Sequence, residues 1–217
     1  MTDLIASLCP LPCLSCENPG ARRWGQRLCP RCADEIPDVL ERVLPGGSLA
    51  GGWAIGSYAG PLGSLLRRGK YGGDEQALRL VGHQLARLFA EERGVGLEGW
   101  LPDLVVPAPT SPGRSFWRGF DAVHLLANPV ATAVGLPLSP RLRRWGGAPQ
   151  ASLDADARRS NLRGRIHPLQ PIPEGSRVLL VDDVVTTGAT AVACADALLG
   201  AGAREVWLLA ACSAIRH

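Results

Sequence analysis

Two neighbouring carboxylates stand where an apolar segment of the chain meets a loop rich in hydroxyl groups. The apolar residues 178–181 lead directly into Asp182 and Asp183, and a short loop with threonines and a glycine follows at residues 186–190. This order predicts a buried strand, a polar turn and the start of a helix. Backbone N–H groups at a helix start can bind phosphate, and carboxylates can hold sugar hydroxyls or a water on Mg²⁺. The segment therefore predicts a site for a sugar that carries a 5′-phosphate.

Three other interpretations compete with a sugar-phosphate site. A strand followed by two aspartates also occurs in a Walker B element, but that element accompanies a GxxxxGK[ST] loop. The nearest candidate for such a loop, residues 63–70, has one intervening residue too many, and Tyr71 follows the lysine. Response-regulator receivers have an acidic pocket near the domain start and lack the Thr-Thr-Gly continuation. A purely structural turn would not need two carboxylates together. We therefore favour the sugar-phosphate site.

The stretch 178–190 resembles the signature for phosphoribosyl pyrophosphate (PRPP) of type I phosphoribosyltransferases. The resemblance implies an α/β fold, in which helices flank a parallel sheet, and it implies PRPP bound together with Mg²⁺. Asp182 and Asp183 would be the catalytic carboxylates that bind the ribose hydroxyls. The residues expected to bind the 5′-phosphate are Thr186, Thr187, Gly188, Ala189 and Thr190.

Four of the seven cysteines form a pattern that is typical of a structural zinc site. Two residues separate Cys13 from Cys16 and Cys29 from Cys32, and twelve residues lie between the two pairs. Thiolates at this spacing can bind one ion from the same side, and two such pairs complete a tetrahedron around Zn²⁺. Residues 17–28 have too few apolar side chains to fold unaided, so a bound metal would supply the missing free energy.

A disulfide framework is the alternative for these cysteines, but it conflicts with a cytoplasmic location. Residues 1–12 lack the basic start and apolar run of a secretory signal. The long uncharged stretch 123–140 contains a histidine, an asparagine and three prolines, which argues against a membrane span. We expect a soluble cytoplasmic protein. Cys9 remains without an assigned role, and Cys194 and Cys212 are expected to be buried apolar side chains.

The length of 217 residues suits one α/β domain with a small appendage. We place a zinc-binding module at residues 1–45 and a phosphoribosyltransferase-like domain at residues 46–217. Residues 111–170 contain nine arginines and three aspartates, a local excess of six positive charges. This excess indicates either a solvated face or a groove for a polyanion, whether pyrophosphate or nucleic acid.

Hydrophobic periodicity predicts strands that alternate with helices, and this alternation favours a parallel sheet. The expected strands are 53–58, 104–106, 177–181 and 205–211, and the expected helices are 74–93, 120–134 with a kink at Pro129, and 189–199. We expect residues 141–165 to form a mobile loop. Lys70 is placed in a glycine-rich turn, where its charge could approach an anion or remain solvated.

The chain resembles the competence protein F (ComF, GntX-like) family along nearly its whole length. The matching pieces occur in the family's order: the four-cysteine module, Gly69-Lys70-Tyr71, Val105-Val106-Pro107-Ala108-Pro109, Arg118-Gly119-Phe120-Asp121, Gln150-Ala151-Ser152-Leu153, Arg158-Arg159-Ser160-Asn161 and the PRPP signature. Where the family often has Asn-Gln, this chain has Asp121-Ala122, so the resemblance implies no polar role for these two side chains.

The resemblance also implies roles for basic residues and for partners. The loop 107–115 would bind pyrophosphate, with Arg114 and Arg118 neutralising it, and the segment with Arg158 would close over PRPP. Lys70 is a further expected PRPP-binding residue. Single-stranded DNA is an implied partner, with proteins of DNA uptake or recombination as further partners. Trp117 and Trp145, which lie within the arginine-rich residues 111–170, are expected to offer stacking for bases.

Two hypotheses on function therefore remain open. In the first, the protein is a phosphoribosyltransferase that acts on an unidentified acceptor. In the second, it is a competence-associated protein that binds PRPP and handles DNA.

Overall fold

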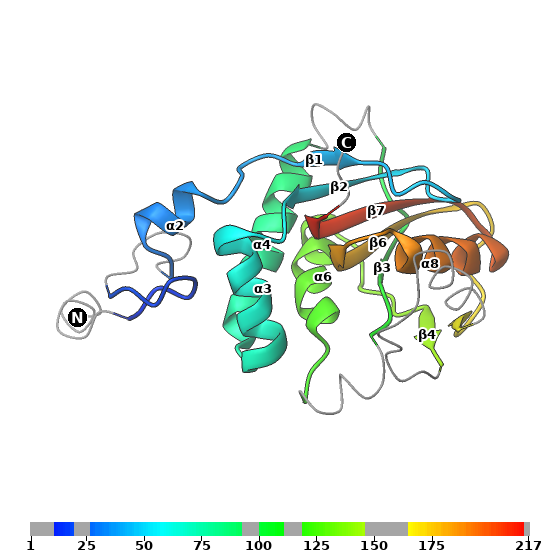
Figure 1. Cartoon of the computed structure of the whole chain (residues 1–217). Helices are drawn as coiled ribbons and strands as arrows, with labels where there is room; N and C mark the ends of the chain where they lie inside the picture. The colour runs from blue at the N-terminus through cyan, green and yellow to red at the C-terminus, as the bar shows by residue number, and fades with distance from the viewer. Residues whose placement is uncertain (1–10, 20–26, 93–99, 111–118, 146–164, 215–217) are drawn as a thin grey trace.

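A five-stranded sheet with the strand order β1-β2-β7-β6-β3 forms the centre of the protein (Figure 1). The computed structural model describes residues 11–19, 27–92, 100–110, 119–145 and 165–214. Strands β2, β7, β6 and β3 run parallel, and β1 pairs with β2 in the antiparallel direction at one edge. The predicted α/β fold with a parallel sheet is therefore confirmed, with an antiparallel edge strand added. The strands span Glu41–Val43 (β1), Gly51–Gly56 (β2), Leu104–Pro107 (β3), Ser176–Val185 (β6) and Ala203–Ser213 (β7).

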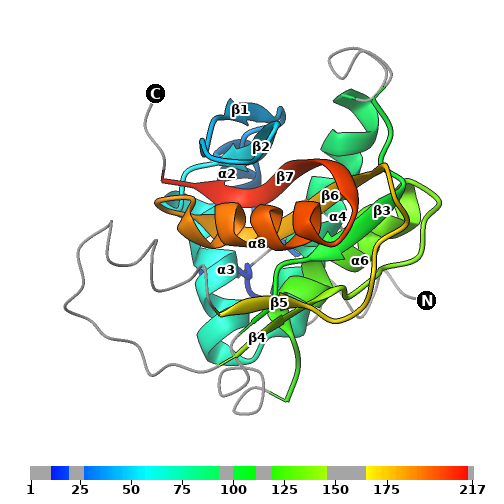
Figure 2. The same cartoon turned by 90° about the vertical axis from the view of Figure 1, so that its right-hand side faces the viewer.

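Helices cover both faces of this sheet, which explains why its strands are apolar without a polar face. On one face lie α3 (Gly60–Gly72), α4 (Glu75–Glu92) and α6 (Ala122–Ala133). On the other lie α8 (Ala189–Gly200) and a two-stranded hairpin of β4 (Leu142–Arg144) and β5 (Ile166–Pro168) (Figure 2). In β6, Leu179 and Val181 pack on the α3 side, whereas Leu180 packs on the α8 side.

Most of the predicted elements are present, and three differ from expectation. The predicted turn around Lys70 is wrong, because Lys70 lies in the last turn of α3, which ends at Gly73 with a positive φ of 72°. The predicted mobile loop 141–165 is wrong at its start, where residues 142–144 form β4. Strand β6 continues past its predicted end at Val181 and includes both aspartates. Helix α6 agrees with expectation in containing Pro129, and the kink at this residue stays a prediction.

The four-cysteine segment packs directly on the helices of the α3 side. It contains the short helix α2 (Pro30–Asp34). Leu14 and Leu28 are buried in the same apolar cluster as Leu62 and Leu66 of α3. Strand β1 belongs to the central sheet, so the last residues before position 46 are in contact with the second part of the chain. The division into domains at residue 45 remains a prediction.

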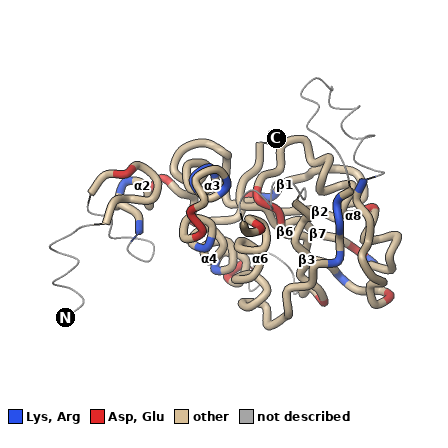
Figure 3. The backbone as a smooth tube through the Cα atoms, turned by 90° about the horizontal axis from the view of Figure 1, so that it is seen from below, with Lys and Arg blue, Asp and Glu red and all other residues tan. Residues whose placement is uncertain are grey.

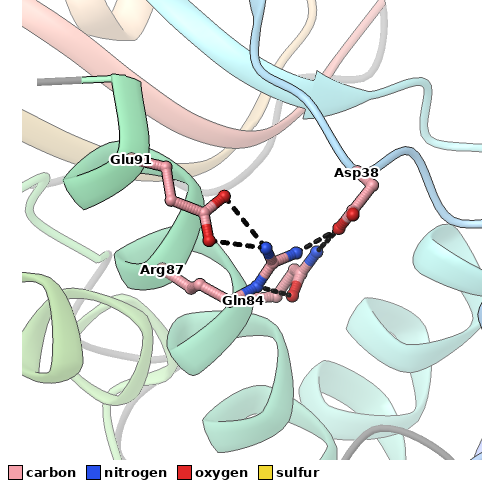
Figure 4. Close-up of polar contacts among 4 residues, drawn as sticks. All are labelled: Asp38, Gln84, Arg87 and Glu91. Carbon is pink, nitrogen blue, oxygen red and sulfur yellow. Dashed lines mark hydrogen bonds and ion pairs between the residues drawn. The ribbon is translucent and has the colours of Figure 1, made fainter. Parts of the chain in front are cut away.

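Polar contacts add a second link between this N-terminal segment and α4. Figure 4 shows Arg87 donating to both carboxylate oxygens of Glu91 at 2.8 and 2.9 Å, and to the Gln84 amide oxygen at 3.2 Å. Arg87 also forms an ion pair with Asp38, and Gln84 donates to the same carboxylate at 3.1 Å. Because Asp38 follows α2, this network holds the exit of the four-cysteine segment against α4.

Within the described parts of the chain, no helix is both long enough and apolar enough to cross a membrane.

Candidate functional site

The end of β6 presents its two carboxylates to opposite faces of the sheet. Successive side chains of a strand alternate between faces, so Asp182 follows Leu180 toward α8 and Asp183 follows Val181 toward α3. The neighbours agree with this assignment. Asp182 is 8% exposed and interacts electrostatically with Arg144 of β4. Asp183 forms an ion pair with Lys70 of α3.

The ion pair between Lys70 and Asp183 is close and shielded from solvent. Lys70 Nζ lies 2.7 Å from Asp183 Oδ2, and the two side chains are only 13% and 17% exposed. The ammonium group also lies 6.0 Å from the centre of the Tyr58 ring. The structure thus brings two of the predicted site residues together, from α3 and from β6. Binding of PRPP by either residue remains a prediction.

Burial changes the acidity of Asp182. Loss of solvent raises the pKa of Asp182 first, and the neighbouring negative charge of Asp183 raises it further, to about 7. The backbone N–H of Asp183, which donates to Asp182 Oδ1 at 2.8 Å, and the charges of Lys70 and Arg144 act in the opposite direction without cancelling the rise. Asp182 is therefore a carboxyl group that changes protonation near neutral pH.

The predicted phosphate loop connects β6 to α8 and leaves its hydroxyls accessible. Thr186 and Thr187 are exposed, and Thr187 Oγ1 accepts a hydrogen bond from the N–H of Ala189 at 3.4 Å. Gly188 is the N-cap residue of α8, with φ at 74°. A Cβ at Gly188 would lie 3.0 Å from Pro45 Cβ. The positive φ and the closeness of Pro45 both favour glycine at position 188. The N-cap of α8 therefore has no side chain.

A second polar cluster lies at the end of β3, next to the predicted pyrophosphate loop. Asp121 is the N-cap of α6 and accepts from the N–H groups of Val123 at 2.9 Å and His124 at 3.3 Å. Its Oδ1 also accepts from Thr110 Oγ1 at 3.0 Å. Burial raises the pKa of Asp121, but hydrogen bonds from His124 and Thr110 outweigh this and lower it. Asp121 therefore has a polar role, which the resemblance did not imply.

This cluster borders a cavity of about 150 Å³ between β3 and the β4–β5 hairpin. The residues that line it, through backbone or side chain, are apolar and charged: Pro107, Ala108, Pro109, Thr110, Asp121, His124, Pro140, Leu142, Arg143, Arg144 and Leu169. The predicted ligands Arg114, Arg118 and Arg158 lie outside the described residues.

The four cysteines of the predicted zinc site converge. Their Sγ atoms all lie within 4.8 Å of one another. Cys16 Sγ and Cys29 Sγ are 3.7 Å apart, and a tetrahedron with Zn–S bonds of about 2.3 Å has an edge of about 3.8 Å. All four are free thiols, so the disulfide alternative is wrong. The donor set and its spacing fit Zn²⁺.

Backbone groups around Cys13 favour the thiolate form that a metal needs. The N–H of Cys29 donates to Cys13 Sγ at 3.4 Å. Burial raises the pKa of Cys13, but backbone donors from Cys16, Cys29 and Ser15 outweigh it and lower the pKa to about 6. Cys13 and Cys32 are buried, whereas Cys16 is exposed.

Sequence reasoning missed Arg144, whose charge acts on Asp182, and Tyr58, whose ring lies near Lys70. Arg144 was counted among the arginines of a mobile loop, although Leu142, Arg143 and Arg144 form a strand with alternating burial. In the sequence these residues are one apolar side chain followed by two arginines, so no period-two pattern distinguishes them from a loop.

The raised pKa of Asp182 predicts a pH-dependent stability of the ligand-free protein. Between about pH 4 and pH 7, Asp182 is ionised in the unfolded chain but remains protonated in the folded protein. The charged and titratable groups around it in the fold are Asp183, which opposes ionisation, Lys70 and Arg144, which favour it, and the thiol of Cys194. The stability that protonated Asp182 contributes to the folded protein is therefore fully present at low pH. It is lost as the pH rises through the folded pKa of about 7, and the unfolding free energy then stays constant with respect to this group. We expect the unfolding free energy of Asp182→Asn, measured with urea, to rise relative to wild type from pH 4 to pH 7.

The control is Asn128→Ala, an exposed substitution on α6 that involves no ionisable group, so its difference from wild type should not change over this range. A constant difference for Asp182→Asn as well would contradict the assignment.

Comparisons with known proteins agree with this architecture. A family model described as a phosphoribosyl transferase domain matches residues 126–216. The DNA utilization protein YhgH of Salmonella typhimurium is 31% identical over 212 residues, which cover 94% of this chain and 83% of that protein. Competence protein F of Haemophilus influenzae is 32% identical over 193 residues, covering 84% of this chain and 77% of that protein. The adenine phosphoribosyltransferase of Frankia casuarinae is 44% identical over 93 residues, which cover 41% of this chain and 45% of that protein.

With its four-cysteine cluster at the N-terminus and its type I phosphoribosyltransferase fold, this chain belongs to the competence protein F family.

Proposed function

We propose that this protein is a competence-associated, phosphoribosyltransferase-like protein that binds PRPP with Mg²⁺ at the β6–α8 turn and single-stranded DNA on the β4–β5 hairpin. The observation that supports the PRPP proposal is the order of chemical groups along the β6–α8 turn. Two carboxylates at the end of a buried strand are followed by exposed threonines and by a glycine that opens α8. Carboxylate oxygens suit Mg²⁺ and ribose hydroxyls, and the helix start suits a phosphate.

A role in competence is supported by the relatives. Competence protein F of Haemophilus influenzae and the DNA utilization proteins are similar to this chain over most of its length. The alternative is an active phosphoribosyltransferase on an unidentified acceptor with no direct role on DNA, which the match to an adenine phosphoribosyltransferase supports. Release of pyrophosphate from PRPP when candidate nucleobases are added would favour this alternative.

We propose Zn²⁺ as the structural metal of the four-cysteine cluster, held by Cys13, Cys16, Cys29 and Cys32. Four thiolates are the ligand set of closed structural zinc sites. The cluster lies next to side chains that are buried against α3 and α4. A bound ion would therefore stabilise the packing of the N-terminal segment on these helices.

The outer face of the β4–β5 hairpin supports the DNA proposal. The ladder pairs Arg143 with His167, and backbone bonds from Trp145 to Arg165 at 2.8 Å and from Leu169 to Arg141 at 2.7 Å extend it at both ends. The alternation of a strand then places these residues on the face opposite to Leu142, Arg144 and Ile166. The outer face consists of Arg141, Arg143, Trp145, Arg165, His167 and Leu169.

This face combines the two features that single-stranded nucleic acids require, positive charge and an accessible aromatic ring. Trp145 is 60% exposed, and the Arg143 guanidinium lies 5.5 Å from the centre of its ring. Figure 3 shows Lys and Arg positions of the backbone beside α8. The face contains no carboxylate. Bases could stack on Trp145 while Arg143 and Arg165 contact phosphates.

For PRPP, we expect Asp182→Asn and Asp183→Asn each to weaken binding of Mg²⁺-PRPP by about 1.5–3 kcal/mol, the size of a lost charged hydrogen bond. Titration calorimetry at pH 8 measures this, because Asp182 is then ionised. The exposed Asp196→Asn variant on α8 serves as the matched control. Wild-type affinity in both signature variants would mean that the carboxylates have only a structural role.

For zinc, we expect one Zn²⁺ per chain in the purified protein and none in a Cys29→Ser, Cys32→Ser double variant. The loss of two of four thiolates leaves the ion without a closed tetrahedron. Elemental analysis measures the metal, and Cys194→Ala is the control because this cysteine is buried in α8, away from the cluster. Full metal retention in the double variant would rule out this ligand set.

For DNA, we expect a labelled single-stranded oligonucleotide to bind at low salt and to dissociate as salt rises, because binding releases counterions. Trp145→Ala should cost about 1–3 kcal/mol in stacking, and Arg143→Ala should reduce the salt slope by about 1. Arg204→Ala, an exposed arginine at the start of β7, is the control. Fluorescence anisotropy at two salt concentrations measures these effects.

The same titration with Mg²⁺-PRPP present tests whether the two ligands share a segment of the chain. We expect competition, because the hairpin leads along the chain to Arg158, Arg159 and Arg163, and the resemblance assigns the stretch Arg158–Asn161 to PRPP. If the oligonucleotide fails to bind even at low salt, the proposed DNA function is wrong and the enzyme alternative is favoured.

A further inference from the structure

Lys70 forms an ion pair with Asp183 Oδ2, an oxygen that the proposed function assigns to the binding of Mg²⁺-PRPP. The ammonium group approaches Asp183 Oδ2 to 2.7 Å, and both side chains are largely removed from solvent. An ammonium at this distance neutralises Asp183 as a bound cation would. The lysine reaches the end of β6 from α3, a helix on the far side of the sheet from α8.

Two neighbouring carboxylates in a largely buried place need such a cation when no ligand is bound. The negative charge of Asp183 raises the pKa of Asp182, whereas Lys70 opposes that rise. Without the lysine, Asp183 would be a mostly buried charge next to a buried carboxyl group, which is costly. The ion pair therefore stabilises the ligand-free site.

The same ion pair obstructs the ligand. A divalent cation or a ribose hydroxyl that takes Asp183 Oδ2 must share or replace the position that Lys70 holds. An ammonium and Mg²⁺ repel each other at contact distance, so both cannot remain on one carboxylate oxygen without loss. The ring of Tyr58, 6.0 Å from Lys70 Nζ, offers the displaced ammonium a second favourable position.

We propose that Lys70 is an internal counter-cation that closes the empty site and must leave Asp183 before Mg²⁺-PRPP binds. This inference rests on the proposed PRPP function. It replaces the sequence-based expectation that Lys70 is a ligand of PRPP. The two roles predict opposite effects, because removal of a ligand weakens binding and removal of a competitor strengthens it.

The test compares Lys70→Met, which keeps most of the side-chain length and removes the charge, with Arg67→Met. Arg67 lies one helical turn earlier and contacts the same Tyr58 ring, at 5.3 Å, so it is a matched control. We expect Lys70→Met to bind Mg²⁺-PRPP roughly five- to tenfold more tightly than wild type in titration calorimetry. Arg67→Met should bind like wild type. Weaker or equal binding by Lys70→Met would overturn the proposal.

A second measurement uses Mg²⁺ alone and does not depend on PRPP. We expect millimolar Mg²⁺ to raise the thermal unfolding midpoint of Lys70→Met but to leave that of wild type and Arg67→Met unchanged, since only the first has an unneutralised Asp183. An equal response of all three proteins to Mg²⁺ would also overturn the proposal. If Lys70→Met does not fold, Lys70→Gln, which can still donate to Asp183, replaces it in both measurements.

The outcomes separate this inference from the proposed function. If wild type and all variants fail to bind Mg²⁺-PRPP, both the function and the counter-cation role are wrong. If wild type binds and Lys70→Met binds less tightly, the proposed function stands and Lys70 is a ligand, so only the inference fails.

Discussion

The two-residue period of β6 is the constraint on which the candidate site depends. Because the strand continues through Asp182 and Asp183, its alternation sends the first carboxylate toward α8 and the second toward α3. The charges of Lys70, from α3, and of Arg144, from the hairpin beside α8, both act on Asp182, and Lys70 also pairs with Asp183. Basic side chains from both layers of the fold therefore meet at the end of one buried strand.

The position of α3 depends in turn on the four-cysteine segment. Leu14 and Leu28 share an apolar cluster with Leu66 of α3, and Arg68 bonds to Glu17 beside the cysteines. The contacts of Arg87 with Asp38 hold the end of the same segment on α4. The N-terminal segment is therefore packed against two helices of the layer that contains Lys70.

Sequence reasoning succeeded where the information was local. The apolar run before Asp182, the spacing of the cysteines and the periodicity of α4 each express a constraint within a few consecutive residues. It failed at α3, because its glycines resemble those of a turn. In the structure, a Cβ at Gly63 would overlap the Tyr58 carbonyl and a Cβ at Gly69 would overlap Leu78. These glycines permit close packing, which no local pattern reveals. The pairing of Lys70 with Asp183 depends on this packing and was therefore also beyond local prediction.

Strand alternation places the two carboxylates of β6 on opposite faces, and it does the same for the two arginines of β4. Arg143 lies on the outer face with Trp145, whereas Arg144 turns inward to Asp182. On the proposed function, nucleic acid would bind one side of this three-residue strand and PRPP would bind near the other. A ligand that shifts β4 on its outer face would then change the field at Asp182. By thermodynamic reciprocity, occupation of the carboxylate site would change affinity on the outer face to the same extent. On the proposed function, coupling between the two ligands would then run through one short strand, even if they share no residue.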